Sequence, residues 1–163
     1  MTKYWVLQGN PTKWDSPESL YYEPIRGWSV TGAEKQVHEG DGVLIWISNS
    51  KPALRGLYAA GQVSGTPKYG YPLGWGSDKQ RATRTPFVPL SIHWYLVHHP
   101  VSVEELTSSP FATNQILGMP RKTAYPCTAI EFKAAVKLMQ AHGPTVLPVH
   151  PGVPFEVWWD TTA

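Results

Sequence analysis

The chain has 163 residues, of which 42% are hydrophobic and only 16% charged, and its formal net charge is +2. This composition suits one globular domain with a real core, excludes a disordered chain, and permits a nucleic-acid partner without demanding one. The single cysteine excludes an internal disulfide, and without a signal-peptide core or an apolar run of roughly 20 residues we expect a cytoplasmic protein that does not span a membrane.

The first predicted strand runs from Tyr4 to Gln8 and ends at Gly9-Asn10-Pro11, because proline cannot continue a strand ladder. A loop or short helix is expected after Trp14, and a short helical turn is expected from Gly32 to His38. These elements precede residues 40–63, where the apolar pattern is strongest.

The centre of the sequence predicts a pair of strands. A turn at Gly40-Asp41-Gly42 precedes an unbroken apolar run from Val43 to Ile47, which is typical of a strand buried on both faces. The run ends at the polar pair Ser48-Asn49, and a second apolar strand from Gly56 to Val63 follows at hairpin distance. We expect this pair to form the centre of a small, strongly curved sheet.

A long connection rich in glycine, proline and tyrosine covers residues 64–86, and connections of this length are usually functional. It is followed by the longest predicted strand, Val88 to Val101, which alternates between two faces. The connection carries four basic residues that could contact phosphates, namely Lys68, Lys79, Arg81 and Arg84. The side chains predicted to share one face of the long strand are Leu90, Ile92, Trp94 and Leu96.

The longest predicted helix lies near the end of the chain. A helical turn is expected from Val103 to Leu106, and a long helix from Thr128 to His142, where Thr128 and Glu131 form a capping box. The side chains expected to share one apolar face of this helix are Ile130, Ala134, Leu138 and Ala141. We therefore predict a domain over residues 1–143 and a proline-rich C-terminal strap or linker over residues 144–163.

Several of these segments together resemble the EVE domain, and the resemblance covers roughly residues 3–142. The segments that carry it are Tyr4 to Pro11, Trp28, Gly40 to Asn49, Gly56 to Val63 and Thr123 to Thr128. EVE domains belong to the PUA-like superfamily and are related to YTH domains, which read methylated adenine in RNA. The resemblance implies an α+β fold, in which a curved mixed sheet or open barrel carries a few flanking helices.

The relation to YTH domains also implies roles for individual residues. Asn10 would contact a base edge, Trp28 would form one wall of an aromatic cage beside Ser29, and a tryptophan of the long connection would form the other wall. Trp46 is expected in the core. The candidate base-binding residues are Asn10, Trp14, Trp28, Ser29, Ser48, Asn49 and Trp75, and the candidate phosphate-binding residues are Lys79, Arg81, Arg121 and Lys122.

Each of these residues also has a plainer interpretation. Asn10-Pro11 and Ser48-Asn49 are common strand ends. The loop tryptophans can be packing residues, and Arg121-Lys122 can be a solvated turn. Asp41 is most simply a turn residue rather than a catalytic acid.

The resemblance favours a non-enzymatic module that recognises flipped 5-methylcytosine or 5-hydroxymethylcytosine in DNA. Such a module would be the specificity part of a modification-dependent restriction system, with a fused or associated nuclease. We expect no cofactor and no metal, because no Cys/His cluster has zinc spacing. One alternative is an RNA-binding module for a modified base in tRNA or rRNA. Another is a small enzyme that uses the histidines at 93, 98 and 99.

Overall fold

The computed structural model describes residues 2–9, 27–48, 51–70, 85–96, 99–118 and 122–142. In this part of the chain, eight strands form a curled mixed sheet with the order β2-β6-β4-β3-β1-β8, while β5 pairs with β6 and β7 pairs with β4. The strands are β1 (Tyr4–Gly9), β2 (Gly27–Ser29), β3 (Gly42–Ile47), β4 (Gly56–Val63), β5 (Lys68–Gly70), β6 (Thr85–Tyr95), β7 (Val101–Ser102) and β8 (Ala124–Cys127).

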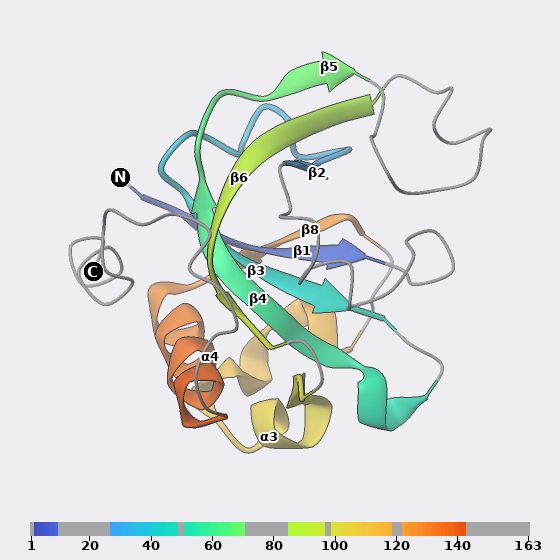
Figure 1. Ribbon diagram of the computed structural model, residues 1–163, viewed down its shortest axis with the longest axis vertical. Coiled ribbons are helices and arrows are strands. Elements are labelled where there is room, and N and C mark those ends of the chain that lie inside the picture. The colour runs from blue at the N-terminus through green and yellow to red at the C-terminus, as the bar shows by residue number, and fades with distance from the viewer. Residues whose placement is uncertain are drawn as a thin grey trace.

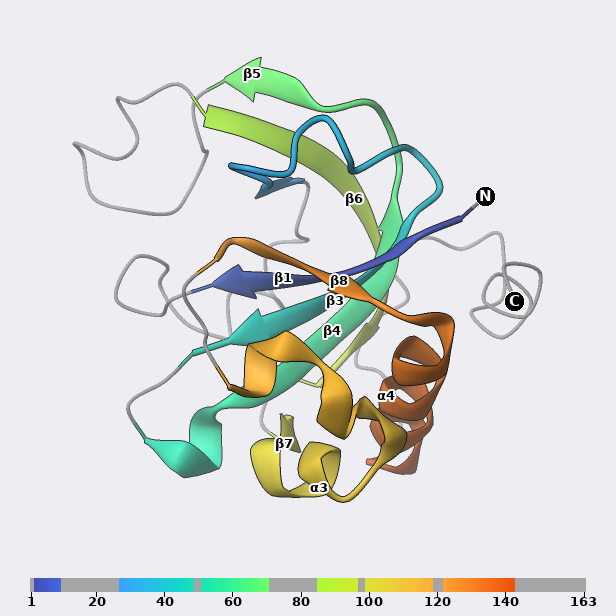
Figure 2. The same ribbon diagram turned by 180° about the vertical axis from the view of Figure 1, so that it is seen from behind.

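The sheet curls into a half-barrel with helices on one side. In Figures 1 and 2, β5 and β6 arch away from β1 and β3, and the helices gather on the opposite side of the sheet. The helices are α3 (Val103–Thr107), α4 (Ala129–Ala141) and the 3-10 turns η1 (Pro52–Leu54), η2 (Pro110–Thr113) and η3 (Gln115–Leu117). The predicted α+β architecture, a curved barrel-like sheet with a few flanking helices, is confirmed. None of the described helices is long and apolar enough to cross a membrane.

The central strand pair forms as predicted. Strand β3 is buried along its whole length and pairs antiparallel with β4. Leu44 and Trp46 pack into a cluster on the helix side of the sheet, whereas Val43, Ile45 and Ile47 pack into a second cluster inside the curl. These are called the helix-side cluster and the barrel-side cluster below. A strand that serves two clusters needs apolar residues at every position, which explains the unbroken run.

The long strand differs from its prediction in length and in alternation. It runs from Thr85 to Tyr95, and Val101 belongs to the separate strand β7. The register between β6 and β4 shifts so that His93 is an extra residue. An extra residue reverses the alternation beyond it. The predicted shared face is therefore wrong: Leu90 and Ile92 join the barrel-side cluster, and Trp94 and Leu96 the helix-side cluster.

Helix α4 starts as predicted but is capped differently. Thr128 is the N-cap, and its hydroxyl accepts a hydrogen bond from the backbone N–H of Glu131 at 3.1 Å. The reciprocal half of the predicted capping box is absent among the described contacts. The Glu131 carboxylate instead accepts hydrogen bonds from Asn114 Nδ2 at 2.8 Å and from Thr113 Oγ1 at 3.3 Å. A complete capping box forms at α3, between Ser102 and Glu105.

The predicted apolar face of α4 is also wrong. Ile130 is 69% exposed, and the helix buries a neighbouring stripe. On this stripe, the ring of Phe132 packs against that of Tyr4, with 4.5 Å between the centroids and 33° between the ring planes. The apolar side chains that the helix buries are Phe132, Ala135, Val136 and Met139. The C-terminal strap predicted for residues 144–163 lies outside the described residues.

Candidate nucleic-acid interface

The carboxyl ends of β1 and β3 lie side by side. These two strands are parallel, and Gly9 is the register partner of Ile47. The backbone N–H of Ser48 continues this pairing by donating to Gly9 O at 2.9 Å. Because parallel strands run in one direction, Gly9 and Ser48 lie at the same end of the sheet.

Trp28 reaches this edge from a different part of the sheet. Its strand β2 pairs with β6, and the curl of the sheet brings its indole to the end of β1. There Trp28 Nε1 donates a hydrogen bond to Gln8 O at 3.2 Å. The side chain is partly buried and packs against the barrel-side cluster. Trp28 is thus neither a fully buried core residue nor an isolated surface side chain.

The indole of Trp28 occupies space that only a glycine leaves open. A Cβ atom on Gly9 would lie 2.7 Å from Cζ2 and 2.9 Å from Cη2 of Trp28. Sequence reasoning treated Gly9 only as part of the turn that ends the first strand. A glycine at the end of an apolar strand is the signal that could have found this contact, since such residues often mark a close approach of another group.

Ser29 and Ser48 are in different situations. The Ser29 side chain is buried, and its hydroxyl shares a hydrogen bond of 3.0 Å with the hydroxyl of Thr31. Because neighbouring residues of a strand point to opposite faces, the Ser29 hydroxyl does not share the face of the Trp28 indole. Ser48 Oγ is buried and has no hydrogen-bond partner among the described residues.

Lys122 lies at the same end of the sheet. Strand β8 runs antiparallel to β1, and the backbone N–H of Gln8 donates to Thr123 O at 2.9 Å. Lys122 precedes Thr123, is exposed, and donates its backbone N–H to Tyr125 Oη at 2.8 Å. Three of the predicted site residues, from separate parts of the sequence, therefore lie near the end of β1. They are Trp28, Ser48 and Lys122.

Apart from Ser29, the other predicted site residues lie outside the described part of the chain. Asn10 and Asn49 are the next residues in the sequence after Gly9 and Ser48. The remaining ones are Trp14, Trp75, Lys79, Arg81 and Arg121. Their roles stay predictions.

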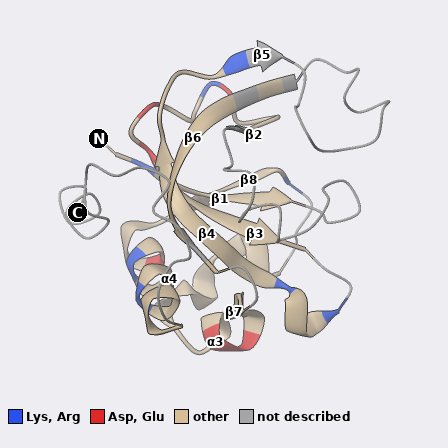
Figure 3. Ribbon diagram, viewed as in Figure 1, with Lys and Arg blue, Asp and Glu red and all other residues tan. Residues whose placement is uncertain are grey.

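The sheet around this edge carries little charge. None of β1, β3, β4 and β6 contains a charged residue. Figure 3 shows charged residues on α3, on α4, on β5 and in loops around the sheet. Among the candidate phosphate contacts, the structure describes Lys68 at the start of β5 and Lys122, both exposed. A contact with a phosphate backbone would therefore have to come from segments that flank the sheet.

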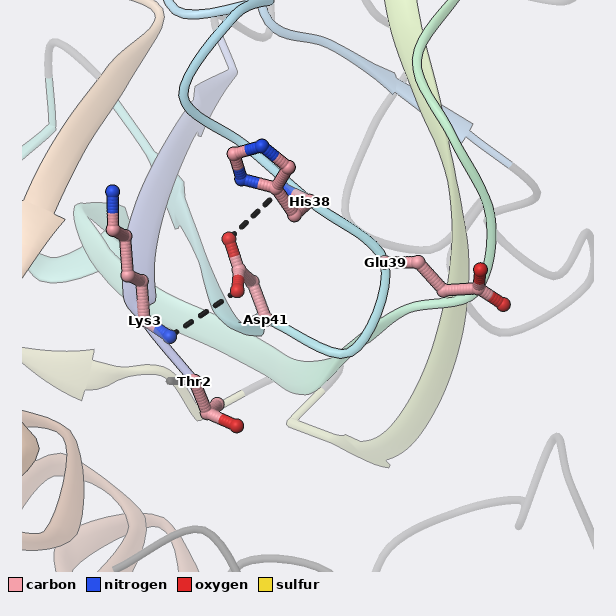
Figure 4. A pocket seen from close by; sticks show the side chains of 5 residues that line it. All are labelled: Thr2, Lys3, His38, Glu39 and Asp41. Carbon is pink, nitrogen blue, oxygen red and sulfur yellow. Dashed lines mark hydrogen bonds between the residues drawn. The ribbon is translucent and has the colours of Figure 1, made fainter.

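A polar pocket lies at the opposite ends of β1 and β3 (Figure 4). At its base, Asp41 is 3% exposed, and its carboxylate accepts hydrogen bonds from Lys3 N at 3.2 Å, His38 N at 2.9 Å and Trp5 Nε1 at 2.9 Å. These bonds tie the turn before β3 to the start of β1. The predicted turn role of Asp41 is confirmed. The described residues contain no group of three or more His, Cys, Asp or Glu that could hold a metal ion.

Comparison with known proteins identifies both a family and a fold. The family model of the EVE domain matches residues 3–138. No curated protein shows significant sequence similarity to the chain. Three solved structures illustrate the fold.

The chain is similar to a hypothetical protein from Leishmania major, with 17% identity, a TM-score of 0.59 and coverage of 87% of this chain and 97% of the other. It is similar to Rpa0253 from Rhodopseudomonas palustris, with 16% identity, a TM-score of 0.60 and coverage of 88% and 97%. It is also similar to human THYN1 in complex with DNA that contains 5-methylcytosine, with 14% identity, a TM-score of 0.58 and coverage of 88% and 99%. At these identities the likeness concerns the fold.

Proposed function

This chain belongs to the EVE domain family, and we therefore propose that it is a module that binds a modified nucleobase in nucleic acid. The proposed ligand is 5-methylcytosine or 5-hydroxymethylcytosine flipped out of DNA. The human THYN1 structure, which shares the fold, is a complex with DNA containing 5-methylcytosine. The observation that carries the proposal is that Trp28, Ser48 and Lys122 all lie near the end of β1.

Trp28 would provide one wall of the base-binding site. Stacking of a base on an aromatic side chain contributes about 1–3 kcal/mol, against the few kcal/mol that it costs to flip a base out of a duplex. The indole is already held by its hydrogen bond to Gln8 O and by its contact with Gly9. Less side-chain entropy would therefore be lost on binding. The second wall would come from Trp75 or, failing that, from Trp14.

The base edge would be read by the polar groups after the two parallel strands. The unpartnered Ser48 hydroxyl can donate and accept a hydrogen bond. Asn10 and Asn49 would add side-chain amides, which can serve the edge of cytosine. Lys122, together with Arg121, Lys79 and Arg81, would contact phosphates.

The module would act without catalytic chemistry of its own. We propose that it serves as the specificity part of a modification-dependent restriction system, in which a fused or associated nuclease performs the cleavage. The proline-rich residues 144–163 would then act as a strap or linker. The resemblance to EVE domains supports this role.

The test is binding to a panel of oligonucleotides that differ at a single base. Each sequence is made as DNA and as RNA, with cytosine, 5-methylcytosine, 5-hydroxymethylcytosine, adenine or N6-methyladenine at that position. A methyl-sized difference in an apolar slot is worth about 1–3 kcal/mol, so we expect 5-methylcytosine DNA to bind roughly tenfold or more tightly than unmodified DNA. Equal affinity across the panel would contradict the proposal, and a preference for modified RNA would identify the module as an RNA reader.

A further inference from the structure

We propose that Gly9 is a positioning residue of the base-binding site, because its missing side chain leaves the space in which the Trp28 indole is held. This inference rests on the proposed function and adds a residue that does not itself touch the base. It concerns how the aromatic wall is placed, and it follows from the geometry at the end of β1.

The alternation of β1 directs position 9 toward the indole. Trp5 and Leu7 point into the barrel-side cluster, and Gly9 is the next position on that face. Its register partner Ile47 belongs to the same cluster. A side chain at position 9 would therefore enter the space between Ile47 and Trp28. A Cβ atom there would lie 3.2 Å from Ile47 Cδ1, in addition to its two closer contacts with Trp28.

The backbone conformation does not explain why position 9 is a glycine. Among the described residues, positive φ angles occur at Gly32, Gly40 and Gly56, and Gly9 is not one of them. Glycine weakens a strand, because it gains conformational freedom in the unfolded chain and offers no side chain for packing. The clearance for Trp28 is the reason that remains.

The indole cannot easily accommodate a larger residue at position 9. The atoms Cζ2 and Cη2 belong to one rigid ring system, so relief of contacts at 2.7 and 2.9 Å requires the whole ring to move. On the same edge of the indole, Nε1 is tied to Gln8 O, the carbonyl of the residue before Gly9. A shift of the ring therefore strains or breaks this hydrogen bond. Ser48 N donates a hydrogen bond to Gly9 O. The Trp28 indole and the Ser48 backbone are therefore both held by the last two residues of β1, Gln8 and Gly9.

The first test measures binding and ring position for Gly9→Ala. We expect affinity for a 5-methylcytosine oligonucleotide to fall about tenfold, a large share of what one lost base stack is worth. In the free protein labelled with ¹⁵N-tryptophan, the Nε1–H resonance of Trp28, assigned with Trp28→Phe, should shift and exchange faster with water. The control is Gly118→Ala, whose Cβ would meet, among the described residues, only Gln115 O, at 3.8 Å. It should leave affinity and the Trp28 resonance unchanged.

The second test is a double-mutant cycle with Trp28→Ala. If Gly9 acts by positioning Trp28, Gly9→Ala should cause no further loss of affinity once the indole is removed. An equal loss in both backgrounds would overturn the inference, as would wild-type affinity of Gly9→Ala with a displaced Trp28 resonance. In either case the discrimination between modified and unmodified bases by the wild-type protein would stand. If the wild-type protein shows no such discrimination, the proposed function itself fails and the inference with it.

A third comparison covers the case in which Gly9→Ala does not fold. A phenyl ring lacks the Cζ2 and Cη2 atoms of the indole, so Gly9→Ala combined with Trp28→Phe should restore a cooperative unfolding transition. Failure of this double variant to fold, when Trp28→Phe alone folds, would show that position 9 excludes side chains for a reason other than Trp28.

Discussion

Trp28 Nε1 donates a hydrogen bond of 3.2 Å to Gln8 O, across 20 residues of sequence. This bond fixes the orientation of an indole that is only partly buried, at the edge where two parallel strands end. Part of the side chain packs on the barrel-side cluster and so contributes to stability. The contributions of Trp28 to stability and to the proposed base binding can be measured separately.

Trp28→Ala should remove modification-dependent binding while the domain stays folded. Truncation of a fully buried tryptophan costs about 3–5 kcal/mol, and Trp28 should lose less because its side chain is only partly buried. The measurement is urea unfolding beside oligonucleotide binding. Trp46→Ala serves as the comparison, because Trp46 is 1% exposed in the helix-side cluster and should show the full cost. Equal destabilisation by the two substitutions would make Trp28 a core residue.

Ser48→Ala should separate binding from folding. The hydroxyl has no partner among the described residues, so its removal should change the free energy of unfolding by less than about 0.5 kcal/mol. If the hydroxyl contacts the base, affinity should fall about 2- to 10-fold, the worth of one net hydrogen bond. Ser102→Ala is the matched control, because it removes the cap of α3 and should cost about 0.5–2 kcal/mol without affecting affinity. A destabilised Ser48→Ala variant with normal affinity would contradict the assignment.

The affinity for duplex DNA should depend only moderately on salt, because the central strands carry no charge. Each neutralised phosphate contributes about −0.9 to the slope of log affinity against log salt, and a slope steeper than about −6 would require a larger basic surface. Lys122→Gln should make the slope less negative by about 0.9, whereas Lys137→Gln on α4 should not change it. The candidate phosphate contacts are Lys68, Lys79, Arg81, Arg84, Arg121 and Lys122.

The second aromatic wall can be located by two substitutions. Trp75→Ala should weaken binding to modified and unmodified bases more than it changes the free energy of unfolding, because a stacking wall contacts any flipped base. If Trp75→Ala binds normally, Trp14→Ala becomes the decisive variant. Normal binding by both variants would place the second wall elsewhere.

The junction between α3 and α4 should make stability depend on pH. His142 Nε2 lies 2.6 Å from Glu105 Oε2, and His142 Nδ1 lies 2.9 Å from His99 O. Burial alone would raise the pKa of Glu105, but the hydrogen bonds from His142 and Ser102 and the charge on His142 lower it below the ordinary value.

A lowered pKa in the folded state means that the folded protein releases this proton more readily than the unfolded chain. The stabilisation is thus fully present above the unfolded-state pKa of about 4.3 and is lost as the pH falls below it. We expect the stability difference between wild type and Glu105→Gln to shrink from pH 6 to pH 3, and Glu104→Gln to show no such trend. A difference that stays constant over this range would show that the carboxylate charge contributes nothing.

The sequence by itself determined the central strands and the start of the last helix. The bounds of β4, the buried run of β3 and the Thr128 cap of α4 all follow from patterns that are complete within about ten residues. Apolar periodicity, turn glycines and capping hydroxyls act over such short distances, so they can be read without knowledge of the fold. The resemblance to EVE domains likewise pointed to Trp28, Ser48 and Lys122, which the structure places around one strand end.

Only the tertiary structure decided the features that depend on distant partners. The extra residue at His93 reverses the alternation of β6, and beside it Gly61 of β4 passes so close that a Cβ atom would collide with Ser91 O. The Glu131 carboxylate bonds to Asn114, which is 17 residues away in the sequence, rather than to the cap of its own helix.

The contact between Gly9 and Trp28 is of the same kind. From its sequence neighbours alone, Gly9 is predicted only to end a strand. It leaves space for the Trp28 indole because the curled sheet brings β2 to the end of β1. Local patterns specify which elements form, whereas the space between elements is set by packing across the whole sheet, and that space determines how the candidate site is built.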